Sequence, residues 1–370
     1  MQPSVAFQDR YGMIKQQESG QVHIGEFRRR RWFWLRLIVF AAIAMMLLTY
    51  GIYVLTPKYP YGICSLLQYY RTDPETVDVL AVGSSLTYTD LNTNILWAEY
   101  GISCFDLASA EQPYWSTYYY LLEALRYHKP KVVLLDLKAI TYQEDKVSRN
   151  RTVLCSYGIL DPVNRWKCIA ECVEPEEFWG YALAYTQIHT NYEGVTGQDF
   201  IITSDGWNVN AGWKGFIEKN ALTSHITPEM DFTFNTARNV NAHEQEFFEK
   251  ILELCNKQDV PVMLIGYPNA DYAHDHHFYC SAFEIAQQYG VTGINYNLPE
   301  HRPKINYSTD CADWQHLNIW GSAVFTRALG EDLSELYHLE DHRGDPSYAS
   351  YDLCADEWFS IFPQFDRRNR

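Results

Sequence analysis

Short apolar runs alternate with amphipathic stretches over much of the chain, which is the pattern of strands and helices in an α/β domain. Val77–Val82 (VDVLAV) ends at Gly83 and is typical of a buried strand, and Lys131–Leu137 (KVVLLDL) shows no polar alternation until Asp136. The same criteria predict further strands at Ser103–Leu107, Val260–Ile265 and Val291–Tyr296, and helices at Leu91–Tyr100, Tyr114–Tyr127, Ala242–Gln258, Phe278–Tyr289 and Ile319–Tyr337. We therefore expect a three-layer α/β/α sandwich around a central parallel sheet, with its ligand site at the carboxyl ends of the strands.

This rhythm breaks down between about residues 139 and 239. The segment contains clusters of Trp, Tyr and Gly, including SDGW at 204–207 and GWKG at 212–215. We expect it to be a largely helical insertion into the α/β domain, in a position that could form a lid over the site.

The apolar run Leu37–Leu55 contains no Asp, Glu, Lys, Arg or His. As a helix it would nearly match the ~30 Å hydrocarbon core of a bilayer. Four arginines, Arg28 to Arg31, precede it directly, so the positive-inside rule predicts a cytoplasmic N-terminus and an extracytoplasmic main domain. A cleaved signal peptide is the alternative, but the run is long and no small-x-small cleavage site follows it.

These features divide the chain into five parts. They are a cytoplasmic basic tail (1–36), a transmembrane helix (37–55), a connector (56–74), an α/β domain with its insertion (75–340) and a C-terminal tail (341–370).

Charge restricts the partners of the main domain. The 370 residues carry a net charge of −16, while the first 36 residues have seven basic and three acidic side chains and a net charge of +4. The remainder therefore carries −20, which repels phosphate backbones and argues against nucleic-acid binding.

The nine cysteines all follow the apolar run, and an oxidising compartment would allow some disulfides, although their odd number leaves at least one thiol unpaired within the chain.

Candidate chemistry begins where the first strand ends, in Gly83-Ser84-Ser85-Leu86-Thr87. A serine on the turn between a central parallel strand and a helix occupies the place of the nucleophile in many α/β enzymes, where backbone N–H groups face a developing oxyanion. The turn is not a G-x-S-x-G elbow, because Thr87 stands at the second glycine position. Taken alone, the glycine and serines also suit an ordinary turn.

A second element, Asp313-Trp314-Gln315-His316-Leu317-Asn318, lies just before the last predicted helix. Asp and His three residues apart on a tight turn can hydrogen-bond, so that the carboxylate orients the imidazole for accepting a serine proton. On its own this pair also fits an N-capping aspartate beside a surface histidine. Its position near the end of the α/β pattern, together with the serine turn after the first strand, favours a catalytic triad.

These motifs resemble the SGNH (GDSL-like) hydrolase superfamily. The resemblance rests on VLAVGSSLT at 79–87, PKVVLLDL at 130–137 and the D-x-x-H-x-N pattern at 313–318, and it covers the sheet-forming parts of residues 75–335. Within the superfamily the chain looks most like membrane-tethered cell-envelope proteins of the teichoic-acid D-alanylation and alginate O-acetylation type.

The resemblance implies Ser85 as nucleophile, His316 as general base and then acid, and Asp313 as the residue that orients it. It implies a serine esterase or O-acyltransferase that acts through an acyl-enzyme on surface polysaccharide or related esters. A multispanning acyl-delivery protein would be a natural partner, besides the bilayer itself.

Two departures concern the oxyanion hole. Ala110 stands where the family has a glycine after the second strand, and the G-x-N-D block after the third strand is absent. Gln112 and Ser84 are the remaining candidates for a donor or substrate contact. Loss of one oxyanion donor costs ~10²–10³ in rate, so a catalytically weak or inactive scaffold that binds glycans or partner proteins is the alternative function.

Other groups carry weaker signals. His274-Asp275-His276-His277 has metal-ligand chemistry but lacks an evident distant fourth ligand, and a polar loop or a helix start at the rim of the cleft explains it as well, so we predict neither a metal nor a cofactor. Cys168 and Cys172 fit a disulfide or two half-buried thiols. Tyr192, Trp207 and Trp213 could stack on sugar rings or pack in the core, and His189 is a further candidate for the cleft.

Overall fold

The computed structural model describes residues 5–73, 75–203, 206–207, 212–221, 226 and 239–368. The chain forms two compact units. One comprises Met1–Thr56 with Ile188–Trp207, and the other comprises Pro57–Gln187 with Asn208–Arg370.

The first unit is built on one long helix, α1 (Val5–Leu55). Its stretch Arg29–Leu55 contains an 18-residue window with a mean hydropathy of 2.3, and within the described part of the chain it is the one helix long and apolar enough to cross a membrane. Such a helix near the N-terminus suits a membrane anchor and suits a signal sequence. Tyr50 and Tyr53 donate to the carbonyls of Phe200 and Ile201. The other elements of this unit are η3 (His189–Gly194), η4 (Gly197–Phe200), β4 (Ile202–Thr203) and β5 (Gly206–Trp207).

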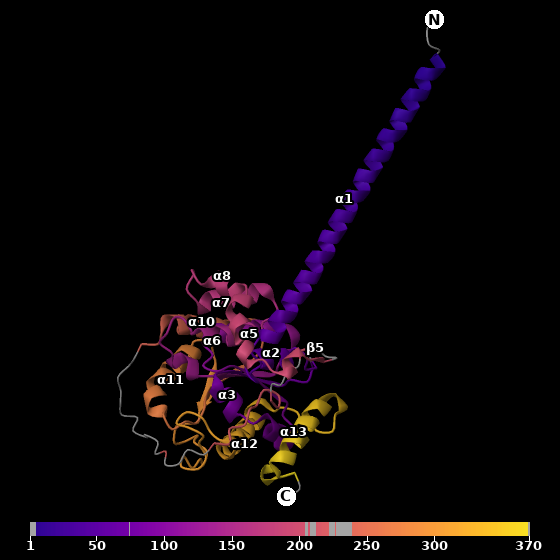
Figure 1. Cartoon of the computed structure of the whole chain (residues 1–370). Coiled ribbons are helices and arrows are strands. Elements are labelled where there is room, and N and C mark those ends of the chain that lie inside the picture. The colour runs from indigo at the N-terminus through magenta and orange to yellow at the C-terminus, as the bar shows by residue number, and fades with distance from the viewer. Residues whose placement is uncertain are drawn as a thin grey trace. The chain divides into compact units, whose positions relative to one another are not determined.

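The second unit contains a five-stranded parallel sheet, which confirms the predicted α/β class (Figure 1). Its strands are β1 (Val79–Gly83), β2 (Cys104–Ala108), β3 (Val132–Asp136), β6 (Val262–Gly266) and β7 (Thr292–Asn295), in the order β2-β1-β3-β6-β7. Counted within the sheet this order is 2-1-3-4-5, the order of doubly wound flavodoxin-like domains. Strands β1, β2, β3 and β6 are buried throughout, as their unbroken apolar runs predict.

Helices cover both faces of the sheet (Figure 1). One face packs Leu80, Val82 and their neighbours against α2 (Ile63–Tyr69), α5 (Tyr114–Tyr127), α7 (Pro162–Cys172), α10 (Ala242–Lys257) and α11 (Tyr272–Gln287). The opposite face packs Val79 and Ala81 against α3 (Ser85–Asp90), η1 (Leu96–Tyr100) and α12 (Ile319–Tyr337). The alternation of adjacent strand residues between the two cores produces the three predicted layers.

A third apolar cluster extends the α12 side of the domain. It joins Trp97 and Ile319 to Tyr351 and Trp358 of α13 (Ala349–Ile361). The segment 341–370, expected to be a tail, therefore packs onto the domain as far as Phe365. The remaining elements are α4 (Thr93–Ile95), η2 (Lys138–Thr141), α6 (Arg149–Ser156), α8 (Phe178–Ala182), α9 (Tyr185–Ile188), η5 (Pro346–Tyr348) and η6 (Pro363–Phe365).

The insertion after β3 begins with short helices, of which α7 packs against α5 and contributes Cys168, Ile169 and Cys172 to the core. Its later part, 212–219, follows the edge of the sheet, where Asp106 of β2 donates its N–H to the Lys214 carbonyl at 2.9 Å. The nine cysteines, all within the described ranges, are not paired in disulfides, and eight of them are buried or partly buried. The predicted pair Cys168 and Cys172 is thus two buried thiols on one face of α7.

Candidate active site

Ser85 is the first residue of α3, and the turn that joins it to β1 needs a glycine at the end of the strand. Gly83 has a φ of +147°, and a Cβ added there would lie 2.3 Å from Asp136 Cβ. Ser84 is the N-cap of α3, because its hydroxyl oxygen accepts the N–H of Leu86. Ser85 is partly exposed although residues 79–84 and 86–95 are buried, so its hydroxyl is the accessible one on this turn.

The structure brings together the serine of the first motif and the histidine of the second. Ser85 Oγ lies 2.7 Å from His316 Nε2. On the other side of the ring, His316 Nδ1 lies 2.8 and 2.9 Å from the two carboxylate oxygens of Asp313. An ionised carboxylate only accepts, so Nδ1 carries the proton and Nε2 is left to accept the proton of the Ser85 hydroxyl.

Asp313 is held as the carboxylate that this arrangement needs. Partial burial opposes its ionisation, but the hydrogen bond and electrostatic attraction of His316 outweigh that cost and keep the pKa of Asp313 well below its usual range. The backbone N–H groups of Gln315 and His316 also donate to Oδ1, each at 2.9 Å. Lys219 of the insertion approaches the other oxygen at 3.3 Å.

The histidine loop is fixed from several directions. The Ala312 N–H donates to the His316 carbonyl at 2.9 Å, and the Asn318 side chain donates to the Thr309 carbonyl at 2.7 Å while capping α12. Next to the histidine, the Leu317 N–H donates to Asp90 Oδ1 at 3.0 Å. Asp90 is fully buried at the end of α3, so one short helix carries both Ser85 and an anchor for the histidine loop.

Asp136, the last residue of β3, fixes the serine turn. Its Oδ2 accepts both the N–H of Ser84, at 3.0 Å, and the Ser84 hydroxyl, at 2.5 Å. Its Oδ1 accepts the N–H of Lys138 at 2.8 Å. The Ser84 hydroxyl, one of the predicted donors, therefore donates to Asp136 and stabilises the turn.

Ala110 and Gln112 differ in their relation to the turn. The Ser109 N–H donates to the Gly83 carbonyl at 3.3 Å, which brings the loop containing Ala110 alongside the Ser84–Ser85 turn. Gln112 is fully buried, and its amide nitrogen donates to Thr117 Oγ1 in α5 at 3.0 Å. Ala110, through its backbone N–H, is therefore the better placed of the two for an oxyanion.

The histidine cluster lies at the start of α11 and is engaged in local contacts. Asp275 forms a buried ion pair with Lys138 at 2.6 Å. His274 lies 2.9 Å from Asp271, and His276 lies 2.7 Å from the Tyr272 hydroxyl. No group of three or more His, Cys, Asp or Glu side chains in the described ranges is arranged to hold a metal.

The remaining candidates are distributed over the two units of the structure. Trp213 packs against the α13 cluster, and Tyr192 is exposed on η3 of the other unit, which also contains His189. The Trp207 side chain lies outside the described structure.

Three residues that contact this site were not singled out from the sequence: Asp90, Asp136 and Lys219. A signal existed for Asp136, because a carboxylate that closes an otherwise apolar strand requires a polar partner. Asp90 and Lys219 gave no comparable local pattern.

Searches against protein-family models and against characterised proteins find no match to this chain.

Chemically, the arrangement joins an accessible hydroxyl, an imidazole with a free acceptor nitrogen and an ionised carboxylate. This order of groups can remove a proton from Ser85 as it attacks an electrophilic carbon, and can return the proton to a leaving oxygen.

Proposed function

We propose that this chain is a serine acyl-ester enzyme of SGNH-hydrolase type. The observation that carries the proposal is the continuous hydrogen-bonded relay from Ser85 Oγ through His316 to Asp313, with distances of 2.7 and 2.8 Å. The relay stands at the carboxyl edge of a parallel sheet, where α/β enzymes bind their ligands.

The reaction would proceed in two balanced steps. Ser85 Oγ attacks the ester carbonyl carbon while its proton moves to His316 Nε2, and collapse of the tetrahedral intermediate expels the alcohol, which takes that proton. Water or a sugar hydroxyl then gives its proton to His316 and attacks the acyl-enzyme, which releases the acyl product and restores the Ser85 hydroxyl. The backbone N–H groups of Ser85 and Ala110 are the proposed oxyanion donors.

The proposal also covers where the enzyme acts and on what substrate, and it starts from the apolar α1 and the acidic main domain. With α1 as an anchor, the enzyme would be single-pass, with a cytoplasmic N-terminus and an extracytoplasmic domain facing cell-envelope polysaccharide. If a polysaccharide hydroxyl accepts the acyl group, the chain is an O-acyltransferase, and a multispanning membrane protein would deliver the acyl group.

Ester turnover by the full-length protein in detergent micelles tests the proposal, with p-nitrophenyl acetate as substrate. Wild-type protein should release nitrophenol, and Ser85→Ala and His316→Ala should reduce release to the uncatalysed background. Ser308→Ala removes an exposed serine from the loop that precedes Asp313 and is the matched control. Turnover by Ser85→Ala at the wild-type rate would overturn the proposal, and release by wild-type protein no faster than the background would favour a non-catalytic scaffold.

A further inference from the structure

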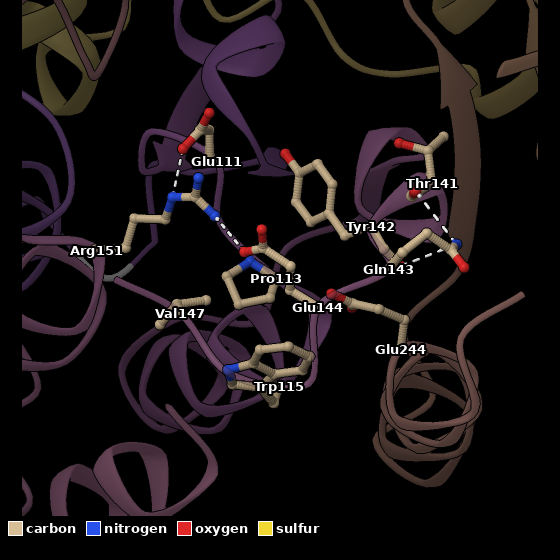
Figure 2. Close-up of a pocket in the computed structure, with 10 residues that line it drawn as sticks. All are labelled: Glu111, Pro113, Trp115, Thr141, Tyr142, Gln143, Glu144, Val147, Arg151 and Glu244. Carbon is tan, nitrogen blue, oxygen red and sulfur yellow. Dashed lines mark hydrogen bonds and ion pairs between the residues drawn. The ribbon is translucent and has the colours of Figure 1, made fainter. Parts of the chain in front are cut away.

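A pocket opens between the loop that follows β2 and the segment that follows β3 (Figure 2). Both strands flank β1, which carries Ser85, so the pocket belongs to the same edge of the sheet. Its volume of about 290 Å³ lies near the lower end, roughly 300 Å³, of ordinary ligand pockets. That size fits one small ring better than a length of polymer.

Glu244 is the most unusual residue of this pocket. It belongs to the first turn of α10, and Figure 2 shows its side chain extending from that helix into the group of lining residues. One carboxyl oxygen accepts the Tyr114 N–H at 2.9 Å and so completes the start of α5. The residue is fully buried, yet its Oε1 has no hydrogen-bond partner. A buried polar atom without a partner is unfavourable, and a ligand that hydrogen-bonds to it would remove that cost.

The charge state of Glu244 restricts the kind of ligand. Burial raises the pKa of this carboxyl well above its usual range, and the Tyr114 N–H only partly opposes the effect. The protonated carboxyl is neutral and can both donate and accept a hydrogen bond. It therefore suits a hydroxyl group, which also does both, better than it suits an ammonium group.

The rim supplies polar groups of both kinds. Arg151 forms ion pairs with Glu111 and, at 3.6 Å, with Glu144, so it joins the two loops across one side of the pocket (Figure 2). The guanidinium offsets part of the negative charge and offers N–H donors, while the two carboxylates accept. Tyr142, which is partly exposed, adds aromatic surface to the lining, against which the C–H face of a ring can pack, while the buried Trp115 ring stacks on His243.

We infer that this pocket binds a neutral, hydroxyl-bearing ring of the size of one monosaccharide unit, with Glu244 Oε1 and the Arg151 rim as its polar contacts. As the ring subsite of an ester substrate the inference rests on the proposed function, whereas binding itself requires no reaction at Ser85. A cation would lack an ionised group at Glu244 and would meet the guanidinium that pairs with both rim carboxylates, and an anion would face those carboxylates, Glu111 and Glu144.

Ligand-observed saturation-transfer NMR on full-length Ser85→Ala protein tests binding without turnover. The probes are methyl β-D-glucopyranoside and N-acetylglucosamine, with ethanolamine and acetate as charged comparators. Either sugar should bind, and Glu244→Leu should weaken it by at least about tenfold, the effect of one lost hydrogen-bonding group. Glu244→Gln should retain the affinity to within about threefold, because a neutral amide replaces a neutral acid.

Two further variants make the outcome decisive. Glu253→Gln changes an exposed position of the same helix and should leave binding unchanged. Arg151→Met alters only the partly exposed rim, so the variant should fold and should bind the sugar more weakly, even if Glu244→Leu fails to fold. Sugar binding that survives both Glu244→Leu and Arg151→Met, or ethanolamine binding in preference to both sugars, would overturn the inference. Loss of esterase activity in Ser85→Ala with sugar binding intact separates this result from the test of the proposed function.

Discussion

Ser84 donates both its backbone N–H and its hydroxyl to one carboxylate oxygen of Asp136, at 3.0 and 2.5 Å. This contact joins the end of β3 to the turn that carries Ser85, across a sequence separation of 52 residues. The position of the proposed nucleophile thus depends on a residue that does not take part in the proposed chemistry.

Replacement of Asp136 by Ala should destabilise the fold and reduce activity together. It leaves the buried N–H and hydroxyl of Ser84 and the N–H of Lys138 without an acceptor, at a cost of about 3 kcal/mol or more. Urea unfolding measures the loss, and kcat should fall at temperatures where the variant is still folded. Unchanged stability and kcat would show that the contact is incidental.

Gly83→Ala should disable the same turn by steric means. The φ of +147° disfavours a side chain, and the new Cβ would meet Asp136 Cβ at 2.3 Å. We expect a loss of about 2 kcal/mol or more in the free energy of unfolding, together with a large loss of ester turnover. Gly197→Ala is the control, because nothing lies within 4 Å of its added Cβ, and it should be near neutral. Equal thermal midpoints and rates for the two variants would contradict the account.

Asp313 and Lys219 should differ sharply in their effect on turnover. Asp313→Asn replaces the acceptor of the His316 Nδ1 proton by a group that can donate, which favours the wrong tautomer, and kcat should fall by ~10²–10⁴. Lys219→Met removes only a partly exposed partner at 3.3 Å, so its effect should stay below about tenfold. Steady-state kinetics on both variants tests this order, and a larger loss for Lys219→Met would contradict it.

Asp90 predicts a pH dependence of stability. Burial raises the pKa of this carboxyl well above its usual range, despite the hydrogen bonds from Thr89 and Leu317. The folded state therefore binds a proton more tightly than the unfolded chain, whose Asp pKa is about 3.9. The stability from this group is fully present below that pH and is lost as pH rises through the folded pKa.

Asp90→Asn removes this titration. Its free energy of unfolding relative to wild type should therefore improve as pH is raised from about 4. Urea unfolding of both proteins at pH 4.5, 6 and 7.5 measures the trend. If the difference in free energy of unfolding does not change with pH, or if the Asn variant becomes relatively less stable as pH rises, Asp90 is not the source of the pH dependence.

The fold was predictable because its signals are local. Apolar runs such as Val77–Val82 and Lys131–Leu137 mark strands that are buried on both faces, and the structure confirms the parallel sheet that they predict. The bounds differ by one or two residues at strand ends, and the predicted helix Leu91–Tyr100 is divided into α4 and the π-helical η1.

The proposed triad residues were also recognisable, since each sits on a turn with a characteristic local motif. The supporting contacts were not. Asp90 reaches Leu317 across 227 residues and Lys219 reaches Asp313 across 94, and neither position shows a periodicity or spacing that depends on its partner. Such contacts are set by how the strands and loops assemble, which local patterns do not encode.

The most direct test of the account is covalent labelling by a fluorophosphonate, followed by intact-mass measurement and peptide mapping of the full-length protein. An activated serine hydroxyl displaces fluoride from phosphorus, so wild-type protein should gain one adduct on Ser85. Ser85→Ala should gain none, and Ser308→Ala should be labelled like wild type. Absence of an adduct on folded wild-type protein, or an adduct that persists in Ser85→Ala, would contradict the assignment of Ser85 as the nucleophile.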